Sequence, residues 1–349
     1  AVVGGMTFAL VILILKVTQI ATITLDVTLQ NVFMTAFFTS IGYTASVKVL
    51  KNGGVKVAIF LVLSILLVVF QDLIGVGLAK VFNLNPLLGL ATASIPLVGG
   101  HGTSGSFGPL LEEFGVKGAT TVSFASATFG LIMGSILGGF LAKSLIERNN
   151  IKTPKEYHDK DIPLSDFHHD ESAVLSYNRI MKASSWIFIA MGIGSIITNY
   201  IQSLGLTFPS YIGAMISAAI IKNISDFKGF EIEDKEIETI GGISLSFYLS
   251  LALMGLKLWE LFDLALPMII MLVSQTILMG IFAFIIVFRI MGKNYEAAVF
   301  SSAICGFGMG STANAIANMD ALTNKYGFSQ TPYLVVPIYR QIGRASCRE

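Results

Sequence analysis

Two glycine-rich segments combine bare backbone with side-chain oxygens. The first glycine segment reads GGHGTSG over 99–105, and the second reads CGFGMGST over 305–312. Glycines let a backbone turn and come close to a ligand, and a broken helix presents unpaired N–H groups to anions. Unwound carbonyls and hydroxyl oxygens suit a hard cation such as Na⁺. The candidate ligand-contacting positions are Gly99, Gly100, His101, Gly102, Thr103, Ser104, Gly306, Gly308, Gly310, Ser311, Thr312, Asn314 and Asn318.

The alternative is that these glycines serve only close helix packing, the interpretation we prefer for GLIMGSILGG over 130–139. His101 is a candidate proton acceptor or substrate contact, or else a polar residue that orders the turn. Three histidines at 158, 168 and 169 beside Asp170 and Glu171 superficially resemble a metal site. Within a charged stretch, we interpret them as part of a solvated loop.

Three polar residues interrupt apolar stretches: Gln71 and Asp72 in one, and Gln275 in the corresponding stretch further along. A polar or ionisable side chain at membrane depth is expensive, so each is a candidate binding residue. Asp72 lies towards one end of its span, where water can reach it, whereas the two glutamines lie deeper. Nothing in the chain resembles a nucleophile elbow, a P-loop or a zincin motif, and we expect no enzyme.

The elements that carry these residues are membrane helices. The 349 residues are 54% hydrophobic and only 13% charged, with a mean hydropathy of +0.74. The net charge of +1 gives no reason to expect a nucleic-acid partner, and two cysteines make no disulfide framework. Apolar blocks long enough to cross a bilayer predict an all-α polytopic membrane protein. The expected spans are 3–15, 31–47, 55–80, 119–142, 183–204, 209–221, 240–256 and 266–288.

Two further apolar segments, 86–113 and 295–320, contain the glycine segments and are rich in Gly, Ser, Thr and Asn. Such sequences make poor continuous helices, because each glycine costs about 1 kcal/mol relative to alanine. Non-helical backbone at membrane depth is tolerated only where protein buries it or it lines a cavity. Both segments are therefore predicted to be re-entrant hairpins.

The chain divides into two similar halves. The first membrane repeat is expected over 1–146 and the second over 179–339, with the linker loop 147–178 between them. Gly100 and Gly102 align with Gly306 and Gly308 at a common offset of 206. On this alignment we expect a further helix to precede the first half, corresponding to 183–204 of the second. Residues 340–349, which read like translated adapter sequence, are expected to be a non-native tail that truncates the last helix.

Basic residues predict the orientation of the halves. With both glycine segments re-entrant, sixteen Lys and Arg residues lie at one membrane face and four at the other. The positive-inside rule makes the first face, with the loop 147–178, cytoplasmic. The glycine segments then enter from opposite faces, so the chain is an inverted-topology repeat with broken helices. This architecture is that of secondary transporters, which bind substrate and coupling ions near the midplane.

The sequence resembles the bacterial sodium/glutamate symporter family. The resemblance rests on GGHGT (99–103), SLSFYLSLALMGLKLWEL (244–261), MGKNY (291–295) and CGFGMGSTANAIANM (305–319), and it extends to about Pro337. It implies Na⁺-coupled symport of L-glutamate by alternating access, with both glycine segments carrying the site. Na⁺ is expected near Thr103, Ser104, Thr312 and Asn314. The resemblance implies no cofactor besides Na⁺ and places the protein in the bacterial inner membrane.

Other interpretations remain open. One is a carrier of another dicarboxylate or amino acid. Another is an ion channel, although a channel more often repeats one pore motif in parallel around an oligomer. The sequence also leaves open a homodimer.

Overall fold

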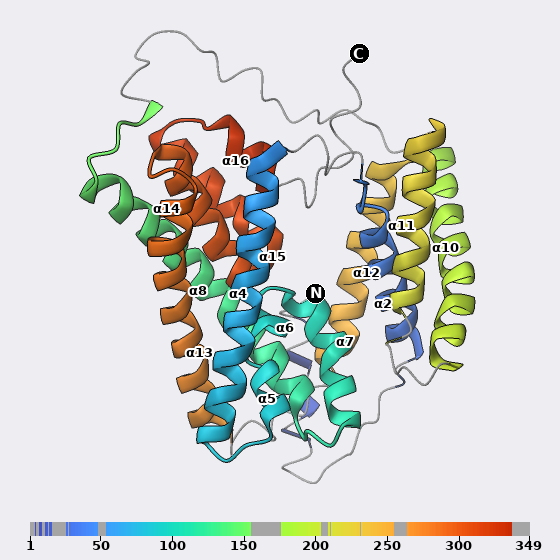
Figure 1. Cartoon of the computed structure of the whole chain (residues 1–349). Coiled ribbons are helices and arrows are strands. Elements are labelled where there is room, and N and C mark those ends of the chain that lie inside the picture. Colours follow the sequence, from blue (N-terminus) through green and yellow to red (C-terminus); the bar gives the residue numbers. More distant parts are fainter. Residues whose placement is uncertain are drawn as a thin grey trace.

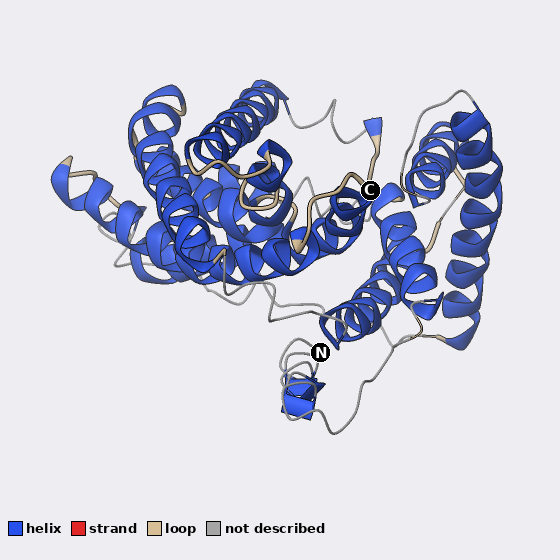
Figure 2. Cartoon of the chain, turned by 90° about the horizontal axis from the view of Figure 1, so that it is seen from below, coloured by secondary structure: helices blue, strands red, loops and turns tan. Residues whose placement is uncertain are grey.

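All the described secondary structure is helical (Figures 1 and 2). The computed structural model describes residues 4, 7–8, 11–12, 14–15, 26, 28–47, 54–154, 176–203, 209, 211–230, 232–254 and 264–336. Its helices are α2 (Thr28–Gly42), α4 (Gly54–Val81), α5 (Pro86–Leu90), α6 (Ser94–Leu97), α7 (Gly100–Glu113), α8 (Ala119–Arg148), α10 (Tyr177–Ser203), α11 (Tyr211–Lys228), α12 (Asp234–Met254), α13 (Ala265–Ile281), the π-helix η3 (Phe282–Val287), α14 (Phe288–Ile290), α15 (Tyr295–Tyr326) and α16 (Gln330–Val335).

Five helical stretches in the described part of the chain are long and apolar enough to cross a membrane. They are 55–81, 119–148, 177–203, 234–254 and 265–290, and each contains or overlaps an expected span. The protein is therefore a multi-pass helical membrane protein. Of the expected span 3–15, residues 4, 7–8, 11–12 and 14–15 are described and helical, and the predicted tail 340–349 lies outside the described residues.

The helices gather into two groups, each drawn from both halves of the sequence (Figures 1 and 2). Helices α2, α10, α11 and α12 pack together as a four-helix bundle. Helices α4 to α8 and α13 to α16 form the second group, here called the core group. The bundle meets the core group where α12 packs against α7. Tyr248 of α12 is fully buried at this junction, in a cluster with Phe38 of α2 and Phe124 of α8.

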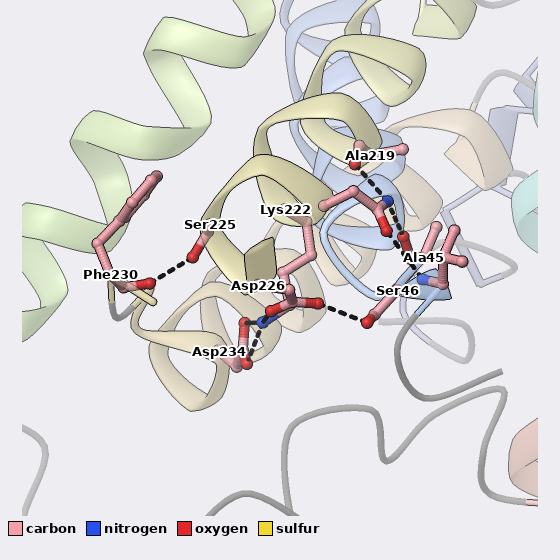
Figure 3. A network of polar contacts seen from close by, with 10 residues as sticks. Ala45, Ser46, Ala219, Lys222, Ser225, Asp226, Phe230 and Asp234 are labelled. Atoms are coloured by element: carbon pink, nitrogen blue, oxygen red, sulfur yellow. Dashed lines mark hydrogen bonds and ion pairs between the residues drawn. The ribbon is translucent and has the colours of Figure 1, made fainter. Parts of the chain in front are cut away.

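Charged residues fasten one end of the four-helix bundle (Figure 3). The side chain of Lys222 on α11 is only 7% exposed, and its Nζ lies 2.7 Å from Asp234 and 3.4 Å from Asp226. Asp226 also accepts a hydrogen bond of 2.5 Å from Ser46, beyond the end of α2. Arg179 of α10 pairs with Glu236 of α12 at 3.0 Å. These pairs bring the ends of all four helices together at one end of the bundle.

The segment 86–113 is divided into three helices rather than one (Figure 1). Helices α5 and α7 extend towards the lower end of the view, and the short α6 lies between them near mid-height. Gly75 of α4 packs directly on Gly89 of α5, where a Cβ at either position would clash with the other backbone. The absence of side chains thus lets α5 return closely along α4.

The segment 295–320 lies within α15, and α15 folds back on itself. Asn318 donates to the carbonyl of Ser302 at 3.2 Å, although sixteen residues of straight helix span about 24 Å. A Cβ on Gly306 would lie 2.6 Å from the Cα of Ala315. At the two ends, the Tyr295 hydroxyl donates to the carbonyl of Gly327 at 2.5 Å. The chain therefore reverses between Gly306 and Ala315, and α15 consists of two antiparallel arms.

Helix α8 carries a stripe of glycines against the folded α15. A Cβ on Gly134 would lie 3.0 Å from the carbonyl oxygen of Cys305, and one on Gly138 would lie 3.1 Å from that of Ser302. Gly130 similarly abuts the carbonyl of Met309. This small-residue stripe confirms the packing interpretation of 130–139, and it seats α15 with backbone close to backbone.

Candidate functional site

The turns of the two glycine-rich regions lie close together against α8. A Cβ on Gly130 would clash with the Met309 carbonyl and would lie 2.8 Å from Cδ2 of Leu97, the last residue of α6. Met309 lies at the reversal of α15. The two regions, about 200 residues apart in sequence, thus meet over one glycine of α8.

Two adjacent residues of α4 bind one turn each. Gln71 donates from Nε2 to the carbonyl of Gly308 at 2.8 Å, at the reversal of α15. Asp72 accepts from the backbone N–H of Ser94 at 3.2 Å, at the start of α6. A carboxylate at a helix N-terminus satisfies an otherwise free N–H group. Gln71 and Asp72 therefore fix the positions of both turns relative to α4.

Gln275 of α13 completes this junction. Its Nε2 donates to the backbone carbonyl of Gln71 at 2.8 Å. Both glutamine side chains are fully buried, and both carboxamide oxygens lack a hydrogen-bond partner among the described residues. The six-residue π-helix η3 begins seven residues after Gln275, and such irregular turns often accompany functional sites.

The polar side chains of the first glycine segment form hydrogen bonds mainly with nearby backbone carbonyls and with α8. Gly100 has φ +69°, a conformation that favours glycine. The Thr103 hydroxyl donates to the carbonyl of Ile95 at 2.5 Å, and the Ser104 hydroxyl donates to that of Gly100 at 2.8 Å. Nε2 of His101 lies 3.0 Å from the Thr128 hydroxyl of α8. The hydroxyls therefore stabilise the start of α7, and each oxygen keeps lone-pair capacity for a ligand.

Gly99 and Gly102 are closely surrounded by protein. A Cβ on Gly99 would clash with the Thr103 side chain, and one on Gly102 would lie 2.9 Å from the ring of Phe37. The Gly102 carbonyl accepts a long hydrogen bond of 3.5 Å from the Tyr248 hydroxyl. Sequence reasoning missed Tyr248, although it lies in one of the stretches that carry the family resemblance.

The second glycine segment forms the reversal of α15. A Cβ on Gly308 would lie 2.5 Å from Leu67 and 2.7 Å from the sulfur of Met279, and one on Gly310 would clash with Asn314. Ser311 and Thr312 belong to α15, but their side chains lie outside the described part of the structure. Every glycine here faces protein, so each permits close packing.

Asn314 and Asn318 bind α8. Oδ1 of Asn314 accepts from the Ser135 hydroxyl at 2.6 Å, and its Nδ2 donates to the carbonyl of Leu131 at 3.2 Å. Nδ2 of Asn318 donates to the carbonyls of Gly134 and Ser302. Both side chains thus clamp α15 onto the glycine stripe of α8, a role that the sequence did not predict.

The structure therefore brings Gln71, Asp72 and Gln275 together with both turns. Of the described residues, no group of three or more His, Cys, Asp or Glu could hold a metal ion. The histidines at 158, 168 and 169 lie outside the described residues. What gathers at the junction is a set of buried carbonyl, carboxamide and hydroxyl groups beside the partly buried carboxylate of Asp72. Such groups suit an alkali cation or a small polar solute, and a junction of this kind in a multi-pass membrane protein is typical of a transporter.

Comparison with known proteins identifies the family. The chain belongs to the sodium/glutamate symporter family, whose model matches residues 1–328. It is 38% identical over 340 residues to the sodium/glutamate symporter of Escherichia coli (strain K12), covering 97% of this chain and 84% of that one. The symporter of Haemophilus influenzae is 34% identical over the same coverage. No solved structure matches the chain.

Proposed function

We propose that the protein is a secondary active transporter that carries L-glutamate into the cell with Na⁺ by alternating access. The observation that carries this proposal is the buried junction at which Gln71 and Asp72 bind the turns of both glycine-rich regions. Family membership names the coupled solutes, because the matching relatives are sodium/glutamate symporters. A transporter needs one site that either side can reach, and two turns meeting at one place supply it.

The proposal includes an inverted repeat with two re-entrant hairpins. The turn formed by α5 to α7 and the two antiparallel arms of α15 support it. In Figure 1, α5 and α7 extend towards the lower end of the molecule, whereas α16, which follows α15, lies at the upper end. Lys56 at the start of α4 pairs at 2.6 Å with Glu296 at the base of α15. The sixteen-to-four distribution of basic residues makes that end cytoplasmic, together with the loop 147–178.

Within this site, the carbonyls of the glycine segments and the hydroxyls of Thr103, Ser104 and Thr312 are the proposed contacts for glutamate and Na⁺. His101 and Asn314 lie beside them as further candidates. Asn318 belongs to the clamp that holds α15. The relatives' organisms favour the bacterial inner membrane as the location.

Transport by the purified protein in proteoliposomes tests the proposal. Labelled L-glutamate should accumulate only when an inward Na⁺ gradient is imposed. Substituting K⁺ for Na⁺ should abolish accumulation, and a proton gradient alone should not restore it. Equal uptake in K⁺ medium would contradict Na⁺ coupling. Competition by unlabelled aspartate, citrate and glutamine tests the alternative that the substrate is another dicarboxylate or amino acid.

A further inference from the structure

Gln71 and Gln275, the glutamine pair, have a feature that their hydrogen bonds do not explain. Each carboxamide nitrogen donates to a backbone carbonyl, at 2.8 Å in both cases. Each carboxamide oxygen is buried and has no hydrogen-bond partner among the described residues. Leaving such an oxygen unpaired costs about 1–3 kcal/mol, so two of them at one junction require a physical reason.

The bond at the Gln71 nitrogen places its oxygen beside the reversal of α15, and the bond at the Gln275 nitrogen places its oxygen beside the backbone of Gln71. The nitrogen of Gln275 binds the main-chain carbonyl of Gln71, and the nitrogen of Gln71 binds the carbonyl of Gly308. Each free oxygen shares its carbon with one of these nitrogens. Gln71 Oε1, Gln275 Oε1 and the carbonyl oxygen of Gly308 thus lie around the contact of α4 with α13 and α15. The Gln71 carbonyl already accepts the helical bond of α4 and the Gln275 amide, whereas the Gly308 carbonyl can accept a second interaction, so three oxygens remain available.

The helix arrangement makes this region favourable for a cation. The first arm of α15 ends near Gly308, and the C-terminal end of a helix carries partial negative charge. The three oxygens are neutral acceptors, which bind a monovalent cation without the cost of burying carboxylates. Unwound carbonyls at the ends of half-helices are the usual ligands of coupling ions in transporters.

We infer that the carboxamide oxygens of Gln71 and Gln275 are ligands of a transported Na⁺ ion. This inference rests on the proposed function and deepens it, because it assigns one ion site to residues outside both glycine segments. Bound at this place, the ion would draw together α4, α13 and the reversal of α15. Because the ion would lie beside the Gly308 carbonyl, its binding would be coupled to the conformation of the second glycine segment.

Two substitutions at each position separate the oxygens from the nitrogens. Leucine removes both the oxygen and the N–H donor, whereas glutamate keeps oxygen ligands and also removes the donor. At pH 8, Q71L and Q275L should raise the Na⁺ concentration for half-maximal uptake about tenfold or more. Q71E and Q275E should bind Na⁺ at least about tenfold more tightly than the leucine variants. Thr276→Val is the matched control, because the Thr276 hydroxyl bonds only within α13, to the carbonyl of Leu272.

Na⁺ binding without transport gives the independent readout. Na⁺, compared with choline, should raise the melting temperature of the detergent-solubilised wild type and of T276V, and should do so much less for Q275L. If leucine and glutamate variants lose Na⁺ affinity equally, the amide N–H groups matter and the inference fails. If the variants keep wild-type Na⁺ affinity, the inference fails while the proposed function stands. A wild type that neither binds nor requires Na⁺ overturns both.

Discussion

Lys222 shows how a charge is retained within a membrane protein. Its ammonium group is largely withdrawn from solvent between Asp226 and Asp234, and the same network reaches Ser46 beyond α2 (Figure 3). Burial of a charge is tolerable only when the charge is paired and hydrogen-bonded. Removing the lysine leaves two neighbouring carboxylates that are about three-quarters buried.

Lys222→Met should therefore destabilise the four-helix bundle by about 2–4 kcal/mol. Fluorescence-detected size exclusion after heating in detergent measures the melting temperature, which should be lower for the variant. The double variant K222M/D234N should recover part of the loss, because it removes one of the unpaired carboxylates. Lys235→Met on exposed α12 surface is the control and should leave the melting temperature unchanged. Equal stability of K222M and K235M would show that the pair contributes nothing.

At the scale of elements, the exposed ends of α8 report the orientation of the chain. Lys117 lies just before α8 and Lys152 just after it, and both are exposed. Single cysteines at the two positions, in a background without the native cysteines, should react with an impermeant maleimide from opposite sides. Position 152 should be labelled only from the cytoplasm and position 117 only from outside. Labelling of both from the same side would contradict the proposed inverted topology.

The sequence predicted the helical spans well because hydropathy over about twenty residues reports burial in lipid directly. It also predicted that 86–113 would not be one helix, because glycine and proline act on the local backbone. The roles of Asn314 and Asn318 could not be predicted, because their partners on α8 lie far away in sequence. The pairing of Gln275 with Gln71 likewise depends on how α4 and α13 pack, and spacing along each helix does not encode this.

At the scale of the whole molecule, the two helix groups do not coincide with the two halves of the sequence. Helix α2, from the first half, packs on α10, α11 and α12 from the second. Helix α13, from the second half, packs on α4 and α8 from the first. Each half therefore depends on the other to bury part of its packing surfaces.

This interleaving predicts that a chain cut within 155–175 works only as two co-expressed fragments. Each fragment alone should be degraded or run as an aggregate in size exclusion, because its packing faces lack partners. Co-expressed fragments should co-purify through a tag on one of them and restore Na⁺-driven glutamate uptake. Stable, monodisperse expression of a single fragment would contradict the mutual dependence of the halves.

The hydrogen bonds that join α2 to the bundle also constrain the order of events during synthesis. The Ser46 hydroxyl and the backbone N–H of Val47 bind residues 180 and 176 positions further along. At 5–20 residues per second, α2 waits about 10–40 s for these partners to leave the ribosome. Throughout that interval its buried face, with Phe38, Thr39 and Ser40, has only lipid, the insertion machinery or another nascent segment as a neighbour. We therefore expect the nascent first half to be exposed to membrane quality control until α11 and α12 arrive.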